Sequence, residues 1–94
     1  MGRMAETIES KLRDALRPAR LAVVDESHRH AGHAGARPEG ETHFRVEIVS
    51  ADFGGLGRVA RQRRVYEILA EELRTQVHAL ALTTLTPEEE AARR

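Results

Sequence analysis

The feature that most constrains the fold is a strict alternation of apolar and polar residues in THFRVEIVS, residues 42–50. Phe44, Val46 and Ile48 fall on one side of an extended chain, and polar or charged residues fall on the other. A run with this period predicts a β-strand that buries one face. Such a strand requires neighbouring strands for its backbone groups and packed helices over its apolar side.

Other segments carry equally clear helix or strand signals. The expected elements are a helix over 5–16, strands over 21–27 and 42–50, a helix over 59–74, a strand over 77–84 and a short helix that begins at Thr86. Pro18 ends the first helix, because proline cannot continue a helical hydrogen-bond ladder. Thr86 and Pro87 are typical of an N-cap and of the first helical position.

The order α-β-β-α-β-α predicts one small α/β (α+β) domain over residues 1–94, with a three-stranded mixed sheet and helices packed on it. We expect about 5–90 to be ordered and the tail at 91–94 to fray. The first two strands, joined by a loop, should be antiparallel, and the second and third, joined by a helix, should be parallel. His43, His78 and the loop at 28–41 should therefore meet at one edge of the sheet.

Four of the five histidines lie between residues 25 and 44, in a chain without cysteine. Imidazole is a common ligand for zinc, copper, iron and nickel, but the spacing here matches no zinc motif. Three interpretations follow: a self-contained metal site, a site that takes its thiolates from a partner, and a solvated loop. Two-histidine Rieske centres show that the second is chemically possible. His43 and His78 could equally be hydrogen-bonded structural residues.

Composition and charge exclude several classes of function. Acidic and basic residues number 15 each, so the net charge is zero, which argues against a surface that is cationic throughout. No apolar run approaches the ~20 residues of a membrane span, and the first ten residues lack a hydrophobic signal core. We therefore expect a cytoplasmic protein with no membrane contact. Ser27 beside His28 is adjacency without triad geometry, and no enzymatic activity is expected.

Five segments in order resemble the BolA family. They are LAVVDESHRH (21–30), GETHFRVEIVS (40–50), the F-x-G of DFGG, RQRRVYEILAEEL (61–73) and VHALALTTLTPEE (77–89). The resemblance implies a fold like the class II KH domain, with the element order given above. It also implies a monothiol glutaredoxin as partner in a heterodimer, with a [2Fe-2S] cluster shared between the two proteins and glutathione. On this basis the isolated chain carries no cofactor and is a monomer.

The resemblance also assigns residues. The family histidine of the VHAL motif corresponds to His78, and the second ligand comes from the loop between the first two strands. We assign that ligand to His33, with His30 as the rival and His28 as the weaker choice. His43 belongs to the family's T/S-H-F segment and is interpreted as structural or as a support for the ligands. Many members carry R-H-R where this chain reads RQR at 61–63, which leaves the two proposed ligands untouched.

The alternative interpretation is a DNA-binding transcriptional regulator, as BolA-like proteins are also described. Gly54 and Gly57 frame a G-x-x-G loop that could let the backbone approach a phosphate. The basic side chains that follow it are Arg58, Arg61, Arg63 and Arg64. The same arginines could instead bind glutaredoxin or the carboxylates of glutathione, or pair with acids of their own helix such as Glu67, Glu71 or Glu72.

Overall fold

The computed structural model describes residues 2–27 and 42–93. In chain order the elements are α1 (Arg3–Leu16), β1 (Arg20–Asp25), β2 (His43–Val49), the 3-10 turn η2 (Ala51–Phe53), α2 (Arg58–Ile68), α3 (Ala70–Thr75), β3 (Ala79–Leu85) and α4 (Pro87–Ala92). The expected order of helices and strands is confirmed. The domain is α+β, with a three-stranded mixed sheet among the described residues.

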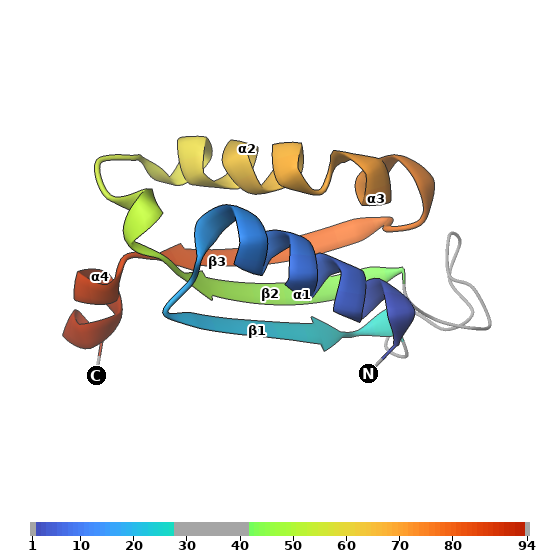
Figure 1. The fold of residues 1–94 in the computed structure, drawn as a ribbon, viewed down its shortest axis with the longest axis horizontal. Coiled ribbons are helices and arrows are strands. Elements are labelled where there is room, and N and C mark those ends of the chain that lie inside the picture. The colour runs from blue at the N-terminus through green and yellow to red at the C-terminus, as the bar shows by residue number, and fades with distance from the viewer. Residues whose placement is uncertain (1, 28–41, 94) are drawn as a thin grey trace.

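The strand topology is the one that the connections predicted. The sheet order is β1-β2-β3, with β1 antiparallel and β3 parallel to the central β2. In this register Ile48 of β2 lies opposite Leu21 of β1, and Phe44 of β2 lies opposite Leu80 of β3. Figure 1 shows that β1 ends, and β2 and β3 begin, at the same end of the sheet.

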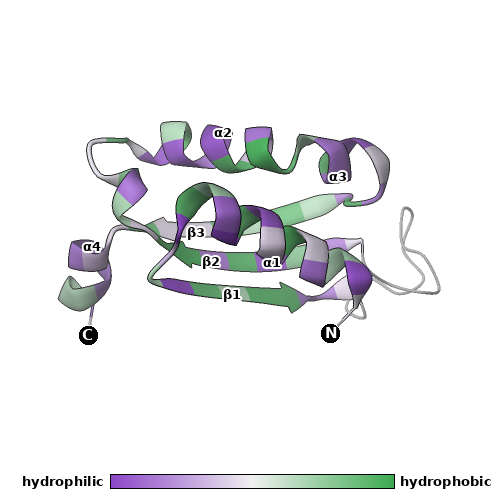
Figure 2. Ribbon diagram, in the orientation of Figure 1, coloured by the Kyte–Doolittle hydropathy of each residue, from purple (hydrophilic) through white to green (hydrophobic). Residues whose placement is uncertain are grey.

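The hydrophobic core fills the space between one face of the sheet and helices α1 and α2 (Figure 1). Figure 2 shows hydrophobic residues running along the strands and recurring at intervals on the helices. The core is built from Ala5, Ile8, Leu12 and Leu16 of α1, Phe44, Val46 and Ile48 of β2, Phe53, Val65, Leu69 and Val77. Each fully buried large side chain of this kind contributes about 1.5–3 kcal/mol relative to exposure. The apolar side of the alternating strand is therefore the buried one, as the sequence predicted.

Ser50 joins three parts of the fold at the other end of the sheet. Its side chain is fully buried, and its hydroxyl donates to the carbonyl of Leu16 at 2.7 Å. Its N–H donates to the carbonyl of Leu85 at 2.9 Å, and its hydroxyl oxygen accepts from the N–H of Asp52 at 3.1 Å. These bonds give Ser50 and Asp52 a turn-forming role after β2.

Several boundaries differ from those expected. The helix predicted over 59–74 is divided at Leu69, whose backbone leaves helical geometry with φ −101° and ψ 19°. The third strand begins at Ala79 rather than at residue 77, and α4 extends to Ala92, two residues into the segment expected to fray. No helix among residues 2–27 and 42–93 is long and apolar enough to cross a bilayer.

Candidate functional site

Two histidines lie close together at the end of the sheet where β2 and β3 begin. The ring centroids of His43 and His78 are 6.3 Å apart, and the ring planes are tilted by 38°. The two residues are 35 positions apart in sequence, and the parallel pairing of β2 with β3 brings them together. The topological prediction is confirmed for this pair. The loop histidines His28, His30 and His33 lie outside the described residues.

The backbone of His78 is fixed, although its side chain is exposed. The carbonyl of Thr42 accepts hydrogen bonds from the N–H of His78 at 2.7 Å and from the N–H of Ala79 at 3.2 Å. These two bonds explain why the strand begins one residue after the histidine. They also hold the imidazole at the margin of the sheet, where it faces solvent rather than the core.

Ser27 and Thr42 form a buried polar clamp between the end of β1 and the start of β2. Both residues are buried, at 6% and 0% relative exposure. The hydroxyl of Ser27 accepts the N–H of Thr42 at 2.9 Å and the N–H of His43 at 3.1 Å. Ser27 in turn donates its own N–H to the carboxylate of Asp25 at 2.8 Å. The two points where the 28–41 segment joins the sheet are therefore held in fixed positions.

Sequence reasoning missed this role for Ser27, which it considered only as a possible nucleophile beside His28. The hydroxyl accepts two backbone hydrogen bonds in a buried position, which is a structural task. A signal was present in the sequence, because Asp25 two residues before Ser27 is the pattern of an Asx turn. The distant partners, Thr42 and His43, could not be read from that pattern alone.

A side-chain hydrogen bond orients the ring of His43. Its Nδ1 lies 2.8 Å from the hydroxyl oxygen of Thr42. When Nδ1 carries the proton and donates to that oxygen, Nε2 is the unprotonated nitrogen; in the other tautomer Nε2 carries the hydrogen. The partly buried His43 ring is thus held beside the exposed ring of His78, which suits a supporting residue as well as a ligand.

The described residues do not make a complete metal site. Within ranges 2–27 and 42–93, no three His, Asp or Glu side chains gather at a spacing that would hold a metal ion. The donors at this edge are the imidazoles of His43 and His78, and the chain has no thiolate to add. An iron–sulfur cluster normally takes thiolate ligands, with histidines replacing them on one iron in Rieske-type centres. The donor set fits one side of such a cluster.

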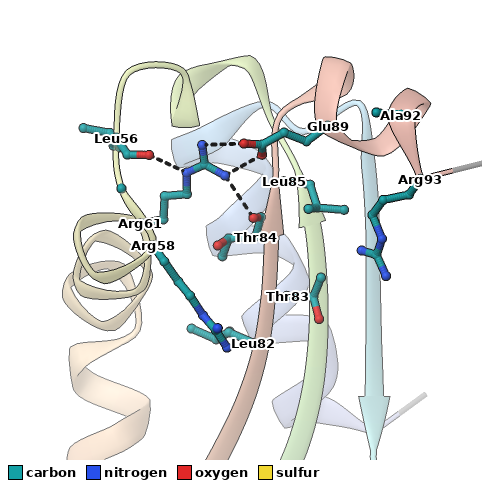
Figure 3. Close-up of a pocket in the computed structure, with 11 residues that line it drawn as sticks. Leu56, Arg58, Arg61, Leu82, Thr83, Thr84, Leu85, Glu89, Ala92 and Arg93 are labelled. Carbon is teal, nitrogen blue, oxygen red and sulfur yellow. Dashed lines mark hydrogen bonds and ion pairs between the residues drawn. The ribbon is translucent and has the colours of Figure 1, made fainter.

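The second region of interest is the glycine loop and the start of α2, where Arg61 is engaged within the protein. Its guanidinium forms a two-pronged ion pair with Glu89 of α4, at 2.6 and 3.1 Å. It also donates to the carbonyl of Leu56 at 2.8 Å and to that of Thr84 at 3.1 Å, and it lies 5.8 Å from the centroid of the Phe53 ring. Its side chain is only 11% exposed. Arg61 thus joins α2, β3 and α4 (Figure 3).

The contacts around Glu89 favour the ionised form of its carboxyl group. The hydrogen bonds from Arg61, followed by the bond from the N–H of Thr86, lower the pKa of Glu89 to about 2. The Glu89 carboxylate accepts that N–H at 2.8 Å, and the hydroxyl of Thr86 accepts the N–H of Glu89 at 3.1 Å. This reciprocal pair is a capping box, which confirms Thr86 as the N-cap that the sequence predicted.

The acids of α3 pair with residues other than Arg58, Arg61, Arg63 and Arg64 of α2. Glu71 pairs with Arg74, and Glu72 pairs with Lys11 of α1 at 2.6 Å. The suggestion that Glu71 and Glu72 neutralise the loop arginines is therefore wrong. The Glu71–Arg74 pair lies within α3, three positions apart, whereas the Lys11–Glu72 pair connects α1 with α3.

The glycines of the loop differ in what they require. Gly55 has φ +80°, a left-handed conformation that favours glycine and turns the chain. At Gly54 a Cβ would come within 3.2 Å of the carbonyl oxygen of Ala51. A Cβ on Gly57 would meet nothing within 4 Å. Chain turning therefore accounts for Gly55 and the close approach of the Ala51 carbonyl for Gly54, whereas Gly57 leaves open space at the start of α2.

The remaining loop arginines face solvent. Arg58, Arg63 and Arg64 are exposed, in contrast to Arg61. Arg58 lines a groove of about 580 Å³ between the start of α2, the end of β3 and α4, and its side chain extends along the groove toward Leu82 (Figure 3).

Comparison with known proteins gives consistent matches along nearly the whole chain. The profile of the family described as BolA-like protein matches residues 12–89. The DNA-binding transcriptional regulator BolA of Escherichia coli (strain K12) is 52% identical over 89% of this chain and 76% of its own length. Protein BOLA1, chloroplastic, of Arabidopsis thaliana is 47% identical over 90% of this chain, which spans about half (54%) of that relative. The solved structure of BolA1 from Arabidopsis thaliana superposes with a TM-score of 0.84 at 44% identity, covering 95% of this chain and 97% of that one.

Proposed function

The chain belongs to the BolA-like protein family, and from that membership and the histidine edge we propose that it is an accessory protein that completes an iron–sulfur cluster. Its partner in the proposal is a monothiol glutaredoxin, with which it shares a bridging [2Fe-2S] cluster in iron–sulfur trafficking or iron sensing. His78 and one loop histidine, His33 or its rival His30, ligate one side. A cysteine of the glutaredoxin and the thiolate of glutathione ligate the other.

The observation that supports this proposal most strongly is the position of His78. Its imidazole is exposed, its backbone is fixed by two hydrogen bonds to Thr42, and a second imidazole lies 6.3 Å away. A ligand for a cluster shared between two proteins must be both accessible and held in place, because mobility would add an entropic cost to every ligation.

The absence of cysteine determines which cluster ligands this chain contributes in the proposal. A chain without thiolates cannot hold a [2Fe-2S] cluster by itself, so at least two ligands must come from elsewhere. Two neutral imidazoles in place of two thiolates also make the cluster less negative and raise its reduction potential. The bound cluster would supply electron-transfer or transferable-cluster chemistry, and the chain supplies two imidazole donors and the surface that receives the partner.

His43, Thr42 and Ser27 have supporting roles in this proposal. The Ser27–Thr42 clamp fixes the chain on both sides of the 28–41 segment, so the segment that supplies the loop ligand is anchored at both ends. The same clamp sets the position of His78 through the carbonyl of Thr42. Supports of this kind orient ligands, and their loss commonly weakens metal binding about 10–100-fold.

The proposal is tested by co-expression with a monothiol glutaredoxin, followed by visible absorbance and circular dichroism of the purified complex. We expect His78→Ala and His33→Ala to alter the cluster spectrum, with His28→Ala as the matched control that leaves it unchanged. If His30→Ala has the effect and His33→Ala does not, the loop ligand is His30. Identical spectra for all of these variants would refute histidine ligation by this chain.

A second candidate function is DNA binding, because several relatives, including the Escherichia coli protein, are named DNA-binding transcriptional regulators. The exposed Arg63 and Arg64 beside the glycine loop are suited to phosphate contacts. Arg61 is unsuited to a test, since its replacement would remove the contacts that join α2, β3 and α4.

This candidate predicts DNA affinity that falls steeply with salt and falls further in Arg63→Ala and Arg64→Ala, each reducing the salt slope by about 1. Arg13→Ala on α1, whose side chain pairs with Glu9, is the control. Undetectable binding at low salt would eliminate the candidate.

A further inference from the structure

The outer edge of β3 is an unpaired strand edge. β3 pairs with β2 on one side only, and the sheet order among the described residues places it last. Successive residues of a parallel strand direct their backbone groups to opposite sides. The carbonyl of Leu85 accepts the N–H of Ser50, so it points toward β2, whereas the carbonyl of Thr84 points outward to Arg61. By the same alternation, Leu82 directs its N–H and carbonyl outward.

A groove runs along this edge. Its wall includes the four consecutive residues 82–85. Because successive side chains of a strand point to opposite faces, four consecutive lining residues indicate a groove along the backbone edge of the strand. The start of α2 borders it on one side and α4 on the other, and its volume is about 580 Å³. Arg61 covers the carbonyl of Thr84 at one end. Within the described part of the chain, no hydrogen bond reaches the outward backbone groups of Leu82.

The groove carries a positive charge in a chain that is neutral overall. The charged residues that line the groove are Arg58, Arg61, Arg93 and Glu89. Arg61 and Glu89 form an ion pair, so their charges cancel. Arg58 and Arg93 therefore remain as two cationic groups on either side of the unpaired edge (Figure 3). Neither has an ion-pair partner among the described residues.

We propose that this groove binds an extended acidic peptide segment of a partner protein, which adds to β3 as a fourth strand. The backbone of the peptide hydrogen-bonds to the outward groups of Leu82, and its acidic side chains meet Arg58 and Arg93. Strand addition draws affinity from main-chain hydrogen bonds and specificity from the side chains on either side. The proposal is independent of the cluster, because the backbone groups of Leu82 lie about 13 Å along β3 from His78, at about 3.3 Å per residue.

Charge and shape favour a peptide over two other occupants. A second copy of this chain paired through its own β3 would bring two positive grooves together, which like-charge repulsion disfavours. A single-stranded nucleic acid gains much of its affinity from bases stacked on aromatic rings, and no aromatic residue lines this groove. An unpaired backbone edge, in contrast, is the feature that an extended peptide uses.

The experiment uses the full chain labelled with ¹⁵N and a short synthetic peptide, capped at both ends, in which pairs of glutamates alternate with pairs of valines so that both faces of the strand carry glutamate. We expect saturable shifts of the amide resonances of β3 and slowed hydrogen exchange at Leu82. A peptide of the same sequence with every backbone nitrogen methylated should not bind, because it has no N–H group with which to form the ladder. The double variant R58E/R93E should bind the glutamate peptide about tenfold more weakly, and R64E, outside the groove, should bind it normally.

Four results would overturn the proposal. One is no binding by the glutamate peptide, and another is equal binding by the methylated peptide on the wild-type chain, which needs no variant to fold. The third is tighter binding of a single-stranded oligonucleotide of equal charge to the same β3 amides. The fourth is concentration-dependent dimerisation that produces the same shifts without peptide. Circular dichroism of R58E/R93E establishes that its loss of binding is not loss of folding.

Discussion

At the residue scale, single polar side chains hold the separate elements of this fold together. Arg61 contacts the loop before its own helix, the end of β3 and the first turn of α4. Ser27 and Ser50 perform similar tasks at opposite ends of the sheet. None of these contacts follows from local sequence, because Arg61 and Glu89 are 28 positions apart and meet only after β3 has paired. The sequence identified Arg61 as a candidate for binding a phosphate or a partner, whereas in the structure Arg61 pairs with Glu89 of the same chain.

The Arg61–Glu89 pair predicts a pH-dependent contribution to stability. The pKa of Glu89 is lowered from 4.5 to about 2 in the folded state, so its contribution is present above about pH 4.5 and is lost as the pH falls toward about 2. Glu89→Gln, which preserves the capping box, should lower the midpoint of thermal unfolding at neutral pH. The difference in this midpoint between Glu89→Gln and wild type should narrow as the pH falls from about 4.5 to about 2.

Thermal unfolding followed by circular dichroism across this pH range measures the effect, with Glu88→Gln in the same helical turn as control. A difference between Glu89→Gln and wild type that is constant with pH would show that the carboxylate charge makes no contribution.

Ser27→Ala tests the clamp at the histidine edge. The change leaves the buried N–H groups of Thr42 and His43 without their acceptor, which should cost about 1–3 kcal/mol of unfolding free energy. Urea denaturation measures it. Ser10→Ala, on the exposed face of α1, should change stability by no more than about 0.5 kcal/mol. Equal effects of the two substitutions would contradict the clamp.

At the element scale, the strands were predictable and the long helix was predictable only in part. Alternation in residues 42–50 identified β2 and its buried face, because a period of two has one structural solution. The connections then determined which strands are parallel. The break at Leu69 was missed because the apolar pattern of Val65 and Leu69 continues to Leu73 without a proline or glycine. Helical spacing alone does not reveal such a break.

Glu72 also provides a test of how α3 is held against α1. Its side chain is 6% exposed, one carboxylate oxygen contacts Lys11 at 2.6 Å, and Oε1 has no hydrogen-bond partner among the described residues. Lys11→Met should destabilise the fold by about 2 kcal/mol, because it leaves an uncompensated charge in a buried position. The double variant K11M/E72M should recover part of that loss.

A double-mutant cycle by urea denaturation measures the coupling between Lys11 and Glu72. Arg13→Met, which removes a longer and more exposed pair with Glu9 at 3.6 Å, should have little effect. Strictly additive losses for Lys11→Met and Glu72→Met would contradict a stabilising link between the two helices.

At the scale of the whole molecule, the sheet carries two different surfaces at its two ends. Where β3 begins, the exposed His78 lies beside the partly buried His43, and where it ends, a positive groove follows its unpaired edge. The first surface was predictable from sequence, since connection lengths alone brought two distant histidines to one edge. The second was not, because its wall comes from α2, β3 and α4, and its charge depends on which arginine Glu89 neutralises.

The central claim is that His78 is a ligand of a cluster shared with a glutaredoxin. Pulsed electron paramagnetic resonance on the reduced complex tests it directly, with ¹⁵N-histidine incorporated only into this chain. We predict ¹⁵N couplings typical of imidazole bound to iron, reduced in His78→Ala and unchanged in His28→Ala. A complex that holds a [2Fe-2S] cluster but shows no histidine nitrogen coupling, or the same coupling in His78→Ala, would contradict the claim.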